Sequence, residues 1–222
     1  MYRIADDARP ADWVVDGMRG FAESVLSLVP AGFPSYVRIF HPLSNPAHPG
    51  RDGTTWAELA AANGKRAHAG MQLNAIGVDM GDLISWASGT LAPELASTLV
   101  TVLARHTRTP DRCYFAVWEG FGGLPKEVAA APTFIVPRRR YHLLAGPVDA
   151  ARKSVLGSTL PQSPNIWWPE DSAWCVATEI DLQSTYVGCT PECVSDLTSL
   201  HGVEAWAILP ETGVTFDSDA LN

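Results

Sequence analysis

The chain has 222 residues, of which 46% are hydrophobic and 18% are charged, and its formal net charge is −8. This composition is that of a globular protein. The excess of carboxylates argues against binding to nucleic acid or to an anionic membrane surface, because both require basic contacts.

The negative charge is concentrated near one end of the sequence. Residues 154–222 contain ten Asp and Glu residues but no Lys or Arg, and the last basic residues form a short run at 138–140 and 152–153. A surface of one sign attracts cations or basic proteins. The sequence therefore favours a basic protein as partner over nucleic acid.

The first residues, MYRIADDARPADW, lack the apolar core of a secretory signal, and no apolar run is long enough to span a bilayer. The four cysteines are too few and too scattered for a disulfide framework, so we expect free thiols, mostly in the core. These features predict a soluble, cytoplasmic protein.

The apolar pattern of the first half predicts mainly helices. Apolar residues recur at steps of three and four from Val14 to Leu28, and Pro30 ends this stripe. The expected elements are a helix at 12–29, a strand at 36–40, a loop at 42–53, a helix at 55–62 capped by Thr54 or Thr55, a turn or helix at 80–87, and a helix at 92–105.

The second half changes to the period of strands. A helix with Thr190 as cap and Pro191 at its first position is the best-signalled element there. The expected strands are 113–118, 133–136, 141–145, 174–182, 186–187 and 203–209, with helices at 147–156 and 190–201 and a long loop at 157–172.

Helices first and strands later is the order of an α+β fold. We predict a mostly antiparallel sheet of about five or six strands with helices covering one face. The long loop contains Trp167 and Trp168, which need a place to bury, so it does not resemble an inter-domain linker. One domain over 1–222 is therefore favoured, and a subdivision near residue 110 is the alternative.

The motifs GxSxG, GxxxxGK(S/T), HExxH, CxxC and GxGxxG are absent from the sequence. The best paired carboxylates are Glu179 and Asp181, which point to one side of a strand together with Cys175 and Ala177. They are either ligands of a divalent cation, completed by Glu170 and Asp171, or the polar end of a strand that emerges into water.

Two aromatic segments are further candidates for ligand binding. Trp118 and Glu119 precede three glycines, and an acid beside an aromatic ring suits a cation or a sugar. Neighbouring residues on a strand point to opposite sides, so we expect one of Trp167 and Trp168 to anchor the loop. The other ring should then flank a cleft beside the acids at 170–171.

The arginine run at 138–140 has two interpretations. It binds a phosphate or carboxylate, or it neutralises the acidic last third of the same chain. Alternation along a strand places Arg138 and Arg140 on one side and Arg139 on the other, which argues against one compact anion site formed by all three.

Three segments carry a resemblance to known sequences: WWPEDSAWCVATEIDLQSTYVG at 167–188, HTRTPDRCYFAVWEG at 106–120 and RRYHLLAGP at 139–147. In these segments the chain resembles a group of uncharacterised bacterial proteins of about this length. The resemblance covers most of the chain. It implies no activity and no catalytic residue.

The charge polarity and the missing catalytic motifs together favour a non-enzymatic, acidic protein-binding module of the inhibitor or immunity type. The alternative is an enzyme or small-ligand-binding protein that uses a cleft of carboxylates and tryptophans, with or without a divalent metal. No cofactor is expected. The two functions differ in whether the acids are spread over one convex face or converge in a pocket.

Overall fold

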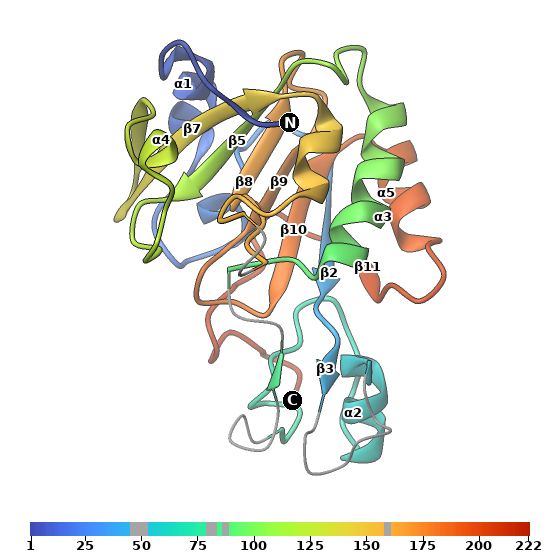
Figure 1. Cartoon of the computed structure of the whole chain (residues 1–222). Coiled ribbons are helices and arrows are strands. Elements are labelled where there is room, and N and C mark those ends of the chain that lie inside the picture. The colour runs from blue at the N-terminus through green and yellow to red at the C-terminus, as the bar shows by residue number, and fades with distance from the viewer. Residues whose placement is uncertain (45–52, 79–83, 86–88, 158–160) are drawn as a thin grey trace.

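The computed structural model describes residues 1–44, 53–78, 84–85, 89–157 and 161–222. Its central feature is an antiparallel sheet of nine strands with the order β1-β7-β5-β8-β9-β10-β2-β11, in which β6 also pairs with β7 (Figure 1). The strands of this sheet are β1 (Arg3–Ile4), β2 (Ser35–Phe40), β5 (Cys113–Trp118), β6 (Thr133–Val136), β7 (Arg139–Gly146), β8 (Ile166–Pro169), β9 (Cys175–Thr178), β10 (Ser184–Cys189) and β11 (Ala205–Ile208).

The helices surround this sheet and differ greatly in length. The α-helices are α1 (Asp12–Gly17), α2 (Trp56–Ala62), α3 (Pro93–Leu103), α4 (Lys126–Ala129) and α5 (Pro191–Thr198). Single 3-10 turns occur at η1 (Arg9–Ala11), η2 (Val25–Ser27), η3 (Ala104–His106) and η4 (Val148–Arg152). Within the described ranges, none of these helices is both long and apolar enough to cross a bilayer.

Apolar clusters lie on both faces of the sheet. One cluster joins Leu99 of α3 and Leu197 of α5 to Trp167, and these two helices lie side by side (Figure 1). The other joins Val14 of α1 and Val25 of η2 to Trp168. Because Trp167 and Trp168 are neighbours on one strand, the two clusters occupy opposite faces.

The α+β prediction agrees with this architecture, but the expected five or six strands are too few. Two strands were not expected, β1, which is only two exposed residues long, and β8. Burial on both faces explains why β8 was missed, since strands of this kind carry near-continuous apolar runs instead of a clear alternation. The segment 166–169 is such a run and forms β8 inside the expected loop. The prediction that helices cover only one face of the sheet is not confirmed, because α1 and η2 pack on the face opposite α3 and α5.

The N-terminal helix is much shorter than the predicted 12–29. It ends at Gly17, and both Gly20 and Ala22 adopt positive φ angles, of 63° and 55°, that no right-handed helix contains. Val14, Met18, Val25 and Leu28 of the stripe still face the core, through a short helix, an irregular segment and a 3-10 turn, but Phe21 does not join this cluster. The apolar pattern thus correctly indicated buried residues, but the backbone between them is not one continuous helix.

Locally signalled elements match their predictions closely. Thr55 caps α2, its hydroxyl accepting from the Glu58 N–H while the Glu58 carboxylate accepts from the Thr55 N–H. Thr190 caps α5 with Pro191 at the first position. The strand predicted at 113–118 is β5, and the one predicted at 133–136 is β6.

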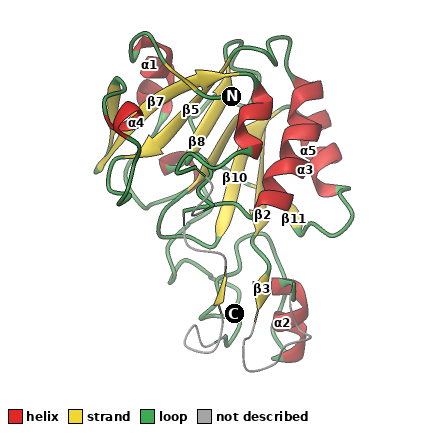
Figure 2. Cartoon of the chain, in the orientation of Figure 1, coloured by secondary structure: helices red, strands yellow, loops and turns green. Residues whose placement is uncertain are grey.

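A small third cluster lies at the end of the molecule that carries α2 and β3 (Leu43–Ser44), where the chain also ends (Figure 1). Phe40, Trp56 and Met71 are buried in it, and β3 pairs with β4 (Ile84–Ser85). Figure 2 shows that the segments connecting it to the large sheet are mostly loops. Most of the loop expected at 42–53 and of the element expected at 80–87 lies outside the described residues.

Candidate functional site

A cavity of about 260 Å³ opens between the segment that follows α1, the ends of β7 and β9, and residues 214–216. Its walls are mainly apolar and include Met18, Leu28, Ile166, Ala177 and Val214. This volume is slightly below that usual for drug-sized ligands, and an apolar wall with a few polar groups is typical of ligand sites. The cavity is therefore the leading candidate for a ligand-binding site.

An ion triad lies in the wall of this cavity. The Arg139 Nε donates to Glu179 Oε1 at 3.1 Å, and the Arg139 Nη2 donates to Asp181 Oδ2 at 2.7 Å. The side chains of Arg139 and Glu179 are only 16% and 13% exposed, whereas that of Asp181 is 71% exposed. Arg139 thus has one sheltered partner and one partner in water.

Tyr141 also lines the cavity, two residues beyond Arg139 on β7. Its ring is buried and stacks on Phe134 at 5.7 Å between centroids. Burial raises the pKa of Tyr141 well above its usual value, and the carboxylate of Glu179 raises it further. Among the described residues its hydroxyl has no hydrogen-bond partner, so a protonated donor stays available in the wall.

Two residues without the freedom of glycine hold left-handed backbone at this cavity. Ala22 lines it with φ of 55°, and Arg138, with φ of 60°, belongs to the two-residue turn between β6 and β7. Such a conformation costs a non-glycine residue about 1 kcal/mol. The guanidinium carbons of Arg138 and Arg139 lie 5.2 and 5.3 Å from the centre of the Phe21 ring, so both arginines lie against a ring that lines the cavity.

Glu179 and Asp181 both line the cavity with Ala177, but not through the predicted alternation of a strand. The strand β9 ends at Thr178, and Thr178 and Leu182, which were predicted on the opposite face, line the cavity too. The plain interpretation, a strand that simply ends in water, describes Asp181 but not Glu179. The pairing of Arg139 with these two acids confirms that part of the arginine run neutralises the acidic third in cis.

The arginine run divides differently from the prediction. Arg140 points away from the cavity and pairs with Glu119 at 3.8 Å, with both side chains about half exposed. Arg138 lies with Arg139 at the Phe21 ring, not with Arg140, because the turn at Arg138 interrupts the alternation of the strand. Strand alternation applies only where the backbone is extended.

Trp118 and Glu119 lie at the end of β5, outside the described lining of the cavity. The Trp118 ring meets the Phe121 ring edge-on at 5.3 Å, and the backbone N–H of Trp118 donates to Asn165 Oδ1. The glycine-rich turn therefore packs against the preceding tryptophan. Ligand binding by this pair stays a prediction.

The expected division between Trp167 and Trp168 is wrong. Both rings are buried, at 0% and 1% exposure, on opposite faces of the sheet. Trp167 packs against Phe115 and Trp174, and Trp168 packs against Trp13, Tyr114 and Phe134. Alternation was correctly applied, but both sides of this strand face a core, so neither ring flanks a cleft.

Glu170 and Asp171 follow β8 at the end of the sheet away from the triad. Glu170 pairs with Arg112 at 2.6 Å on the surface. The Asp171 carboxylate accepts from the Thr107 hydroxyl and from the Arg108 N–H, both at 2.8 Å. These hydrogen bonds hold the loop at 107–108 against the end of β8. Among the described residues, no group of three or more His, Cys, Asp or Glu side chains is placed to hold a metal ion.

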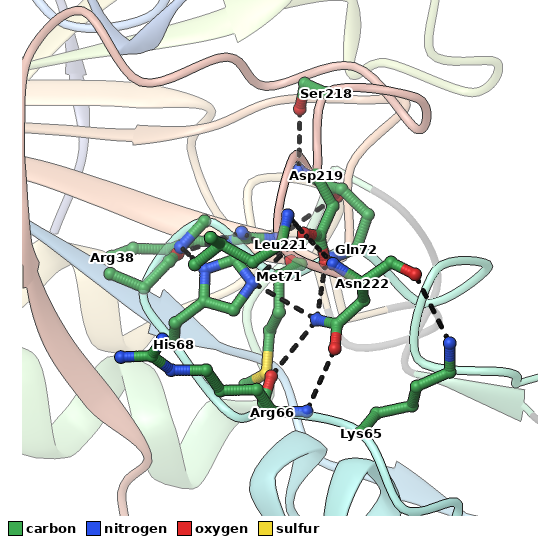
Figure 3. A network of polar contacts seen from close by, with 12 residues as sticks. Arg38, Lys65, Arg66, His68, Met71, Gln72, Ser218, Asp219, Leu221 and Asn222 are labelled. Atoms are coloured by element: carbon green, nitrogen blue, oxygen red, sulfur yellow. Dashed lines mark hydrogen bonds and ion pairs between the residues drawn. The ribbon is translucent and has the colours of Figure 1, made fainter.

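A second polar network lies at the third cluster and was not anticipated (Figure 3). The Asp219 carboxylate, with no exposed side-chain surface, contacts His68 Nε2 at 3.1 Å and accepts from the N–H groups of Gln72 and Leu221. Burial alone would raise the pKa of Asp219, but these hydrogen bonds, that from Asn222 foremost, lower it. Since 151 residues separate His68 from Asp219, no local pattern signals this contact.

His68 in this network is already committed at both ring nitrogens. Its Nδ1 accepts from the Gly70 N–H at 3.2 Å, which places the proton on Nε2, facing Asp219. The Ser218 hydroxyl nearby donates to the Thr215 carbonyl at 2.7 Å and accepts from Gln72. This arrangement fastens residues 218–222 to residues 65–72 and leaves no base free for nucleophilic chemistry.

Arg38 is a third site that the sequence analysis missed. Its guanidinium is fully enclosed, donates to Ser184 Oγ and to the carbonyls of Ala69 and Met71, and lies 4.3 Å from the centre of the Phe40 ring. Burial lowers its pKa, but backbone carbonyls and aromatic faces replace the missing carboxylate. Because all these groups belong to the core, Arg38 is part of the framework.

The cavity is therefore the site where apolar walls, an oriented guanidinium, a free hydroxyl and strained backbone meet. It can bind an apolar body and hold one polar group at Arg139 and Tyr141. In comparisons with protein-family models, with curated proteins and with solved structures, nothing matches this chain.

Proposed function

We propose that the protein binds a small amphipathic molecule in the cavity beside Arg139. The observation that supports this proposal is the position of the triad: a guanidinium only 16% exposed in the wall of an otherwise apolar hollow. An ionised group in apolar surroundings is costly for stability unless it is well paired. A role in ligand binding would explain why a guanidinium lies in this apolar wall.

The opening of the cavity supports the same proposal. Phe216 lines it and is 74% exposed, and Phe21, also in the lining, is half-buried beneath the two guanidinium groups. Aromatic side chains are large and lose little entropy on binding, which suits them to contact a ligand. Positive φ angles at Ala22 and Arg138 are the kind of local strain that clusters at ligand clamps.

A small-ligand site was the alternative interpretation of the sequence. The acidic protein-binding role was favoured there by the charge polarity and the missing catalytic motifs, and it stays a prediction. Glu170, Glu179 and Asp181 each pair with an arginine of the same chain, which reduces the charge they offer to a partner. Two of these three acids converge on the cavity, and this convergence makes the small ligand the better-supported function.

An NMR titration with hexanol tests the proposal, since this neutral probe has an apolar body and one hydroxyl. We expect saturable shifts in backbone amide signals of Met18, Leu28, Ile166 and Ala177, all from the cavity wall. Ala177→Leu fills the hollow and should abolish these shifts, while Ala207→Leu, on exposed β11 surface, should leave them unchanged. Shifts that do not saturate, or that survive Ala177→Leu in a folded protein, would contradict the proposal.

A further inference from the structure

We infer that the ligand of the cavity is a monocarboxylate with an apolar body, and that its carboxylate replaces Asp181 on Arg139. This inference rests on the proposed function and adds the chemical class of the ligand. The two acids that hold the guanidinium differ strongly in exposure.

Glu179 is the permanent partner. One of its oxygens accepts from Arg139 Nε at 3.1 Å and the other accepts from the Asp181 N–H at 2.5 Å, so both are occupied. Its side chain is 13% exposed, and leaving either charge of such a sheltered pair without its partner is unfavourable. Glu179 therefore orients the guanidinium and stays with it when a ligand enters.

Asp181 is the exchangeable partner. Its side chain is 71% exposed and contacts Arg139 only through Oδ2. Exposed ion pairs contribute little, because water and salt replace the interaction at small cost. A carboxylate that arrives with an apolar body gains the burial of that body in addition to the ion pair, and so competes well with Asp181.

The guanidinium has the donors that a carboxylate needs. Of its five N–H groups, one on Nε serves Glu179, one on Nη1 serves the Arg138 carbonyl at 3.3 Å, and one on Nη2 serves Asp181. Once Asp181 leaves, neighbouring N–H groups of Nη1 and Nη2 form the fork that binds a carboxylate through both oxygens. The Tyr141 hydroxyl adds a donor in the same wall.

The charge at the opening favours an anion over a cation. Glu179 neutralises Arg139, and Arg138 adds a second guanidinium on the same Phe21 ring. An ammonium group that reached Asp181 would approach the guanidinium of Arg139, while both oxygens of Glu179 are already engaged. The geometry therefore suits a carboxylate on Arg139 better than an ammonium on Glu179.

Calorimetric titrations with octanoate, octylamine and octanol test the inference, since the three probes share one apolar body. We expect octanoate to bind about tenfold to hundredfold more tightly than octanol, as for a charge-assisted hydrogen bond, and octylamine to bind no better than octanol. Asp181→Asn should tighten octanoate about twofold to fivefold and leave octanol unchanged. Glu170→Gln, which alters another exposed arginine partner, is the matched control and should change neither.

Arginine variants provide the second arm. The double variant Arg139→Gln with Glu179→Gln removes both charges of the sheltered pair, so no sheltered charge is left unpaired to prevent folding; Asp181 keeps its charge in water. It should reduce octanoate affinity to that of octanol, and Arg140→Gln, on the same strand but outside the cavity, should leave it unchanged. Octylamine binding as tightly as octanoate, or octanoate insensitive to the double variant, would overturn the inference while cavity binding stands. Binding of none of the three probes would instead reject the proposed function.

Discussion

The Glu179 carboxylate holds the guanidinium of Arg139 at 3.1 Å across 40 residues of chain, with both side chains largely sheltered from water. The pair joins the start of β7 to the residue that follows β9. These strands are not neighbours in the sheet, because β5 and β8 lie between them. The ion pair therefore closes the cavity wall across the open ends of the intervening strands.

Loss of the Arg139–Glu179 ion pair should lower the stability of the fold. We expect Glu179→Gln to lower the free energy of unfolding by about 1–3 kcal/mol, because a sheltered guanidinium loses its main acceptor. Glu119→Gln, which removes the half-exposed partner of Arg140, should cost less than about 0.5 kcal/mol. Urea denaturation of the two variants measures both values. Equal losses would show that burial of the Arg139 pair has no energetic consequence.

The two tryptophans of β8 should be equally important to the core. Trp167→Ala and Trp168→Ala should each lower the free energy of unfolding by about 3–5 kcal/mol, because each ring is buried in a different cluster. Phe216→Ala, at a ring 74% exposed, should change it by no more than about 0.5 kcal/mol. A small loss at either tryptophan, in chemical denaturation, would contradict the two-faced packing of this strand.

His41 should make stability depend on pH. Burial, and then the nearby charge of Arg38, lowers the pKa of His41 to about 4. An unfolded histidine titrates near pH 6.5, so between about pH 6.5 and pH 4 the unfolded chain binds more protons. Stability should fall by about 3 kcal/mol across this window as pH decreases. His41→Gln should flatten the profile there, whereas exposed His201→Gln should not; an unchanged slope in His41→Gln would refute this assignment.

Asp219 should make stability depend on pH in a lower range than His41 does. Its hydrogen bonds lower its pKa, so its contribution is present above the pKa of an unfolded aspartate and is lost as pH falls through the folded value. Asp219→Asn should cost about 1.5–3 kcal/mol at neutral pH, because His68, Gln72 and Asn222 lose an ionised acceptor. Asp217→Asn, two residues away and exposed, is the control. Thermal unfolding at neutral and acid pH should show the difference between the variants shrinking in acid.

The four cysteines should be unreactive in the folded protein. All are free and buried, and burial raises the pKa of Cys113 to about 12 and that of Cys175 higher still. Thiolate is the reactive form, so its supply is limited by both pKa and access. Mass spectrometry after brief treatment with iodoacetamide should find no labelled cysteine in the native protein and four in the unfolded chain. Rapid native labelling of any one would contradict its buried position.

Elements with local signals were predictable from the sequence. The caps at Thr55 and Thr190 and the strand at 113–118 were recognised because their signals lie within a few residues. Glu179 and Asp181 were singled out from the alternation of a strand, but β9 ends at Thr178 and a turn brings the two acids to the cavity. The helix expected to reach residue 29 failed, because an apolar stripe records which residues are buried and not whether the backbone between them stays helical.

The candidate site was only half visible in the sequence. Glu179 and Asp181 were identified as a pair, but their partner Arg139 was one of three adjacent arginines with two interpretations. Which of the three arginines reaches the two acids depends on the turn at Arg138, whose φ of 60° breaks the alternation of the strand. The remaining walls come from residues near 18–28, 166 and 214–216, segments that have no pattern in common.

The sequence by itself determined the α+β class, most element types and the faces of individual strands, because periodicity and capping act over a few residues. Only the tertiary structure decided the order of nine strands, the burial of both Trp167 and Trp168, and the meeting of Arg139 with Glu179. Each of these depends on hydrogen-bonded pairing and packing between segments far apart in the chain. A strand's own residues specify that it pairs, but the fit of the whole sheet and its two cores selects the partner.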